Sequence, residues 1–108
     1  MSILFFLRKS LNFCIQDLDN CYLLLDTFHM NIEEKDLFKT VSLFGSRVGH
    51  IHIADSNRLY PGAGHLDFIK IMKAIKKTGY KGYLSGEYQP LPDAQTAMKK
   101  YINYMRGV

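Results

Sequence analysis

The stretch "CYLLLDTFHMNIEE" (residues 21–34) decides how the rest of the chain is interpreted. A short apolar run ends in Asp26, and His29 follows three residues later. A segment of helical composition then begins at Asn31, which is a suitable N-cap. A continuous apolar run of this length is typical of a strand buried on both faces. The stretch therefore predicts a buried strand that ends on a carboxylate and an imidazole.

Two further apolar runs follow the same pattern. The run "VGHIHIAD" (48–55) carries His52, and the run "GYLSGE" (82–87) ends in Glu87. Amphipathic segments with helical spacing separate or flank the strands. These segments cover residues 3–17, 31–45, 65–79 and 92–105. Alternating helices and strands predict an α/β fold with parallel strands and right-handed crossovers. Three parallel strands form part of a barrel, or a small three-layer sheet.

Length and composition limit the class of protein. The 108 residues suit one domain, over residues 1–108, or a piece of a larger one. Hydrophobic content of 47% and charged content of 22% are ordinary for a soluble chain. No apolar run reaches the about 18 residues that cross a membrane, so we expect a cytoplasmic protein without a membrane partner. Cys14 and Cys21 fit no metal spacing and are interpreted as buried free thiols.

The net charge of +4 comes largely from lysines on helix-like segments. No aromatic or arginine residue is interleaved among these lysines in a recognisable nucleic-acid motif. We therefore interpret them as solvated helix faces and expect no nucleic-acid partner.

The ends of the three strands carry the residues that suggest chemistry. Ligands of parallel α/β proteins bind beyond the carboxyl ends of the strands, where Asp26, His52 and Glu87 are expected. Nitrogen and oxygen donors of this kind suit a divalent ion such as Mn²⁺, Mg²⁺, Co²⁺ or Zn²⁺. The alternative is that these side chains only cap helices and bind loops.

Other polar groups are expected at the same edge. His29 and Arg58 beside a metal suit a substrate with several oxygen atoms, such as a sugar. Their alternative roles are an N-cap contact for His29 and a surface salt bridge for Arg58. His50 shares one strand face with His52 and is interpreted as a core histidine, with a supporting role beside the metal as the alternative. His65 is interpreted as a local helix cap.

At these residues the sequence resembles the ketose 3-epimerases (D-tagatose and D-psicose 3-epimerases) of the xylose-isomerase-like TIM-barrel superfamily. The resemblance rests on "LLLDTFHMNIEE", "GHIHIADSNRLYPGAGHLDF" and "GYLSGEYQP" and runs from about residue 20 to the C-terminus. It implies metal-dependent C3 epimerisation of an unphosphorylated ketose, with Mn²⁺ expected first among the divalent ions. It also implies the roles of five side chains: Asp26, His52 and Glu87 as metal ligands, Glu87 as the catalytic base, and His29 and Arg58 as substrate contacts.

The chain also departs from that family. Family members hold the metal through one more glutamate on an earlier strand, and this chain offers no residue for that role. We expect a partial TIM barrel equivalent to the last three βα units, with residues 1–20 as an N-terminal helix outside the clearest match. With Glu87 as the only base, the chain alone should be inactive or very slow, because one general acid–base group is worth about 10²–10⁴ in rate.

An open barrel exposes edges and apolar surface. The expected edges are the strands around residues 22–26 and 83–87. Leu24, Ile51 and Leu84 would then need covering, so we expect a homo-oligomer. Two other functions remain open: a non-catalytic remnant or assembly subunit with weak metal or sugar binding, and a nucleic-acid enzyme like the abasic-site endonucleases of the same superfamily. The endonucleases use more metal ligands than this chain offers.

Overall fold

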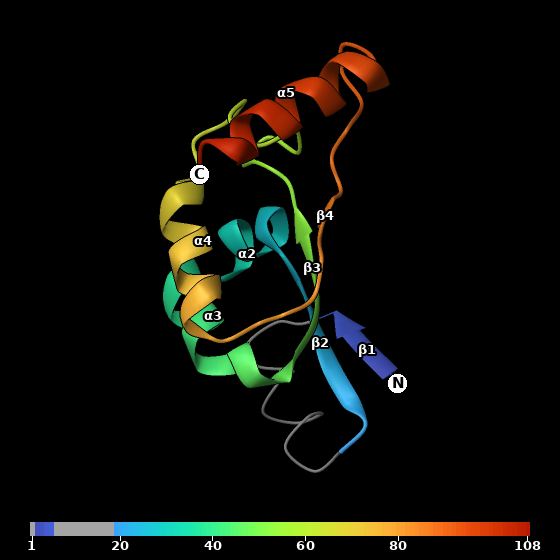
Figure 1. Cartoon of the computed structure of the whole chain (residues 1–108). Coiled ribbons are helices and arrows are strands. Elements are labelled where there is room, and N and C mark those ends of the chain that lie inside the picture. Colours follow the sequence, from blue (N-terminus) through green and yellow to red (C-terminus); the bar gives the residue numbers. More distant parts are fainter. Residues whose placement is uncertain (1, 6–18) are drawn as a thin grey trace.

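Four parallel strands form one sheet in the order β1-β2-β3-β4 (Figure 1). The computed structural model describes residues 2–5 and 19–108. The strands are β1 (Ser2–Phe5), β2 (Cys21–Asp26), β3 (Val48–Ile53) and β4 (Leu84–Gly86). The expected α/β class and the parallel arrangement of the last three strands are confirmed, and the sheet is not a closed barrel.

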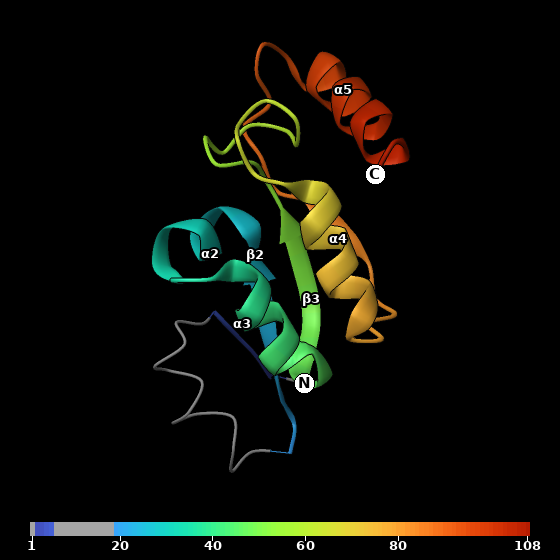
Figure 2. The same cartoon turned by 90° about the vertical axis from the view of Figure 1, so that its left-hand side faces the viewer.

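In the described chain, helices follow β2, β3 and β4, and α3 (Leu37–Phe44) and α4 (Phe68–Lys77) cover one side of the sheet (Figure 2). The other helices are α2 (Thr27–Glu33), the short 3-10 helix η1 (Gly45–Arg47) and α5 (Ala94–Arg106). Figure 2 shows α3 and α4 packed side by side on the same face of the sheet. Helix α5 lies beyond the carboxyl ends of β3 and β4, next to the long loop that follows β3 (Figure 1).

Aspartate side chains fix where three helices begin. Asp26, Asp67 and Asp93 each accept a hydrogen bond from the backbone N–H three residues later. These bonds satisfy amide groups that have no partner inside the helix. The single helix expected over 31–45 is wrong, because the region holds parts of two helices, α2 and α3, with residues 34–36 between them. The chain becomes helical at Thr27, and Asn31 lies inside α2 instead of capping it.

The core lies between the sheet and its helices. Leu23, Leu25, Ile51 and Ile53 point from β2 and β3 toward the helices and are at most 2% exposed. They pack with Phe68 and other apolar residues of α4. Alternate residues of β2 are only half-buried, so the strand is fully buried on one face and not on both as expected.

The three apolar residues that were expected to be exposed, Leu24, Ile51 and Leu84, do not all lie on the same face of the sheet. Ile51 is buried in the core, and Leu84 packs against the core from β4. Leu24 alternates with the helix-facing residues of β2, so it lies on the opposite face of the sheet.

The start of the chain is a strand, whereas the sequence predicted a helix there. Ser2–Phe5 is a strand that pairs in parallel with β2, so the helix expected over 3–17 is wrong at its start. Residues 6–18, with Cys14, lie outside the described residues. Because β1 covers β2, the strand at 22–26 is not an edge, whereas β4 has no further strand beside it in the described chain.

Cys21 is a buried free thiol, as expected. Within residues 2–5 and 19–108, no helix combines the length and the apolar character needed to cross a bilayer.

Candidate functional site

Asp26 is the last residue of β2, and its carboxylate is completely buried. One oxygen, Oδ1, accepts a hydrogen bond of 3.2 Å from the backbone N–H of His29. The carboxylate thus caps α2 while it faces the edge of the sheet. A buried carboxylate needs a cation or several donors near it, because an isolated buried charge is costly.

Arg58 supplies that cation from the loop after β3. Its Nη1 atom lies 3.0 Å from both carboxylate oxygens of Asp26. The guanidinium also lies over the ring of Phe28, with its central carbon 5.0 Å from the ring centroid. Such a cation–π contact adds to the hold on the guanidinium. Arg58 therefore makes the salt bridge considered as an alternative, but with a completely buried carboxylate, while its own side chain is 23% exposed.

His52 lies beside Asp26 on the neighbouring strand. The strand register pairs Asp26 with His52, and Nδ1 of His52 is 3.7 Å from Oδ2 of Asp26. Nδ1 is buried and has no hydrogen-bond partner, although the side chain as a whole is 22% exposed. A buried nitrogen without a partner is unfavourable unless something binds it.

These two side chains fit a shared metal ion. Two ligand atoms that are each about 2.1 Å from one ion lie about 3.0–3.5 Å apart, close to the observed 3.7 Å. Imidazole nitrogen and carboxylate oxygen are both common ligands of Zn²⁺ and Mn²⁺. The donor atoms of Asp26 and His52 therefore suit the divalent metal ion that the sequence predicts.

Glu87 directly follows β4 at the same edge of the sheet. Its backbone N–H donates to the carbonyl of Ile53, at 3.0 Å, and β4 pairs Ser85 with His52. The Glu87 side chain is exposed. In the described part of the chain, no three His, Cys, Asp or Glu side chains are gathered closely enough to hold a metal. The structure thus brings Asp26 and His52 together and places the backbone of Glu87 on the same rim.

The other histidines differ in their positions. His29 is exposed in the first turn of α2, and its ring contacts that of Phe28 at 5.2 Å between centroids. His50 is half-buried, and its ring meets the ring of His52 edge-on at 5.2 Å. His65 is exposed in the loop before α4, and its N–H donates to Ser56 Oγ, so the cap of α4 is Asp67 instead.

Sequence reasoning missed two residues that build this edge. The Thr27 hydroxyl donates a hydrogen bond of 2.6 Å to the carbonyl oxygen of Ala54. In return, the backbone N–H of Ala54 donates a hydrogen bond of 3.0 Å to the Thr27 hydroxyl oxygen. This buried reciprocal pair locks the ends of β2 and β3 together. The signal available was a threonine directly after a strand, which is too common to single out a residue.

The second missed residue is Asp55. Its carboxylate is completely buried and accepts hydrogen bonds from the backbone N–H groups of Ser56, Gly62 and Leu66. Burial raises the pKa of Asp55, but backbone N–H groups, that of Leu66 first, outweigh it and hold the pKa below its ordinary value. Asp55 is therefore an ionised anchor for the loop that carries Arg58.

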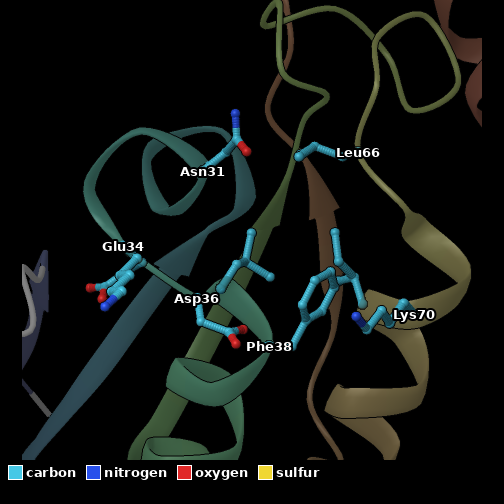
Figure 3. Close-up of a pocket in the computed structure, with 9 residues that line it drawn as sticks. Asn31, Glu34, Asp36, Phe38, Leu66 and Lys70 are labelled. Carbon is cyan, nitrogen blue, oxygen red and sulfur yellow. The ribbon is translucent and has the colours of Figure 1, made fainter.

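A separate pocket lies on the helical side of the molecule. It has a volume of about 290 Å³ and lies between the α2–α3 region and α4 (Figure 3). Figure 3 shows Phe38 close to Lys70, whose ammonium is 4.2 Å from the ring centroid. None of the residues predicted for the site lines this pocket, so it is distinct from the rim of the sheet.

The sequence matches the family described as xylose isomerase-like TIM barrel over residues 12–107. The curated relatives include an L-ribulose 3-epimerase of Methylomonas sp. (strain DH-1), which is 44% identical over 68 residues. That match covers 63% of this chain and 24% of the relative. A D-psicose 3-epimerase of Enterocloster bolteae is 43% identical over 60 residues, which are 56% of this chain and 20% of the relative.

Solved structures agree with these relatives. The apo form of 3-keto-D-glucoside 4-epimerase from E. coli superposes with a TM-score of 0.79 at 32% identity, covering 85% of this chain and 35% of that one. D-psicose 3-epimerase from Clostridium cellulolyticum H10, crystallised with D-tagatose, gives a TM-score of 0.74 at 32% identity, covering 82% and 35%. The chain thus spans about a quarter of the length of the curated relatives it matches.

Proposed function

Because the chain belongs to the xylose isomerase-like TIM-barrel family, whose matched relatives are sugar epimerases and isomerases, we propose that it carries part of a metal-dependent ketose 3-epimerase site. The observation that carries the proposal is the pairing of Asp26 with His52. A buried carboxylate lies 3.7 Å from an imidazole nitrogen that has no hydrogen-bond partner. This is the arrangement expected of two ligands of a divalent cation, and it lies where ligands of parallel sheets bind.

Asp26, His52 and Glu87 are the proposed ligands, and Mn²⁺ is the first choice of metal. The bound ion would polarise the oxygens of a ketose and make the proton on the adjacent carbon more acidic. The exposed Glu87 side chain would have to turn toward Asp26 and His52 to join them as a ligand. The backbone hydrogen bond from Glu87 to Ile53 already fixes its Cα at this edge.

The remaining side chains have roles in the proton transfer and in binding. Glu87 removes the C3 proton of the ketose as a general base. Arg58 and His29 donate hydrogen bonds to sugar oxygens, and the guanidinium of Arg58 is held close to the rim by Phe28. Epimerisation also needs a proton donor on the opposite face of C3, and the family resemblance assigns that role to a glutamate on an earlier strand, which has no counterpart in these 108 residues. For these 108 residues taken alone, we therefore propose that Glu87 exchanges the C3 proton faster than C3 is inverted.

An isotope-exchange assay tests this proposal. D-psicose is incubated in D₂O with the protein and Mn²⁺, and loss of the C3 proton signal is followed by NMR together with formation of D-fructose. We expect Mn²⁺-dependent exchange of the C3 proton that exceeds epimerisation, because one base can remove the proton and return a deuteron on the same face. Glu87→Gln should reduce the exchange by about 10²–10⁴-fold.

The matched control is Glu33→Gln, which changes an exposed carboxylate on α2 to the same amide. It should exchange the proton at the wild-type rate. Equal rates of C3 proton exchange in the wild type and in Glu87→Gln would contradict the role of Glu87 as the base. Stabilisation of the protein by Mn²⁺ without any exchange would instead support the second candidate, a non-catalytic subunit that retains metal binding.

We also propose that the chain self-associates. The outer edge of β4 is unpaired in the described chain, and Tyr83 next to it is 85% exposed. On the sheet face away from the helices, Leu24 is only partly covered. A second copy of the chain would cover both the edge and this face, as closure does in a complete barrel.

A further inference from the structure

Asp55 organises the loop that connects β3 to α4. Its Oδ1 accepts hydrogen bonds of 2.7 Å from the Ser56 N–H and 3.0 Å from the Leu66 N–H. Its Oδ2 accepts one of 2.8 Å from the Gly62 N–H. One buried carboxylate therefore ties together the start, the middle and the end of a segment that spans eleven residues.

The backbone of Asp55 also forms the turn that presents Arg58. The Arg58 N–H donates to the Asp55 carbonyl at 3.0 Å, and the Asp55 N–H donates to the Leu59 carbonyl at 2.9 Å. Inside this turn Arg58 has a φ of 64°, in the left-handed region. A side chain other than glycine is strained there, and such a conformation persists only where the surroundings impose it.

The close packing of the loop on Asp55 leaves little freedom for other arrangements. A methyl group added at Gly64 would collide with the Asp55 carboxylate and the Ser56 hydroxyl. On the other side of the loop, Gly62 has a φ of 99° and lies against the ring of Tyr104 from α5. The segment thus packs closely around the carboxylate.

The Asp55 carboxylate binds backbone N–H groups of its own loop, so its effect on the site runs through the loop. Arg58 is the residue of this loop that reaches the site, with Nη1 3.0 Å from both oxygens of Asp26. We propose that Asp55 is a positioning residue that holds Arg58 on the carboxylate of Asp26 and, resting on the proposed function, on the oxygens of a sugar. The three backbone N–H groups bound to its carboxylate and the left-handed turn at Arg58 belong to the same loop.

Chemical modification of arginine tests this role without metal or sugar. The chain has four arginines, Arg8, Arg47, Arg58 and Arg106, and phenylglyoxal reacts with guanidinium groups that are not held in contacts. Peptide mass spectrometry gives a separate rate for each. Arg47, whose guanidinium donates to the carbonyl of Cys21 at 2.9 Å, serves as the internal reference for unfolding.

In Asp55→Asn we expect Arg58 to react about tenfold faster, which corresponds to about 1.4 kcal/mol of lost protection, while Arg47 keeps its rate. Asp26→Asn, which removes the ion pair directly, should give a similar increase. Gly64→Ala, which keeps the carboxylate but pushes against it, should also expose Arg58. Asp67→Asn is the matched control, because Asp67 accepts a backbone N–H at the start of α4 but lies outside the turn at Arg58.

Two results would overturn the proposal. If Arg58 in Asp55→Asn reacts no faster than in Asp67→Asn, Asp55 does not position it. If Arg58 and Arg47 accelerate by the same factor, Asp55 stabilises the whole fold and has no specific effect on Arg58. Because no metal or ketose is used, either result leaves the proposed epimerase function to be decided by its own assay.

Discussion

Arg58 and Asp26 form a partly buried ion pair in which Nη1 is 3.0 Å from each carboxylate oxygen. The same carboxylate is a proposed metal ligand, so the guanidinium and a cation compete for it. In the metal-free protein, Arg58 balances the charge of a carboxylate that has no exposure to solvent. Metal binding would release Arg58 from that pairing and leave its donors available for a sugar.

This competition predicts the effect of Arg58→Met. Asp26 would be left buried without its cation, so the free energy of unfolding should fall by about 1–3 kcal/mol in the absence of metal. Mn²⁺ should bind more tightly than to the wild type, because it no longer displaces the guanidinium. Urea unfolding and calorimetric titration measure the two effects. Arg106→Met, at an exposed position on α5, should change neither, and unchanged or weaker Mn²⁺ binding in Arg58→Met would contradict the competition.

Thr27→Val tests the lock between β2 and β3. The valine keeps the size of the side chain but removes the hydroxyl that pairs with both backbone groups of Ala54. Two buried polar groups would lose their partner, so the free energy of unfolding should fall by about 2–4 kcal/mol. Thr96→Val, which removes an exposed hydroxyl bonded to Asp93, should cost clearly less. An equal loss of unfolding free energy in the two variants would show that the buried hydrogen bonds of Thr27 stabilise the fold no more than the exposed one of Thr96.

The pH dependence of stability should carry the signature of Asp55. Its pKa in the folded protein lies below the ordinary value, so the unfolded chain binds the proton first as the pH falls. The stability that the ionised carboxylate contributes is therefore complete above about pH 4 and is lost as the pH falls through the folded pKa. Urea unfolding between neutral and acid pH should show a shallower acid decline for Asp55→Asn than for the wild type. An identical decline in the two proteins would contradict this prediction.

Self-association should depend on the open edge of the sheet. Light scattering is expected to show a mass above that of one chain at micromolar concentration. Tyr83→Ser, beside β4, should lower that mass, because the exposed ring is available to a second copy. Ile32→Ser removes an apolar side chain that is 61% exposed on α2, away from this edge, and should have no effect. A wild-type monomer at all concentrations would exclude the proposed association.

The strands and their polar ends were predictable because a short apolar run followed by a carboxylate is a strong local pattern. The β2 strand at 21–26 has the bounds expected for it, and β3 begins at the expected Val48. The pairing of Asp26 with His52 then follows from parallel strands that end at one edge. These features depend on periodicity and strand direction, which a single sequence reveals.

Other features depend on contacts that periodicity does not encode. Apolar residues at helical spacing from Ile3 onward favoured a helix, but pairing with β2 makes Ser2–Phe5 a strand. Asn31 looked like a cap because it precedes two glutamates, whereas Asp26 caps α2 directly at the end of β2. The role of Asp55 comes from three amides of an irregular loop, and irregular loops have no repeat from which such bonds can be predicted.

The proposed site depends on Asp26 and His52 binding one cation, and calorimetric titration with Mn²⁺ measures that binding. We predict that the wild type binds one Mn²⁺ per chain and that His52→Ala lowers the affinity at least about tenfold. Loss of a residue that only hydrogen-bonds a metal ligand already lowers metal affinity by about 10–100-fold. His65→Ala, an exposed histidine in the loop before α4, should bind Mn²⁺ like the wild type. The absence of Mn²⁺ binding to the wild type, or equal affinity in His52→Ala, would contradict a cation shared by Asp26 and His52.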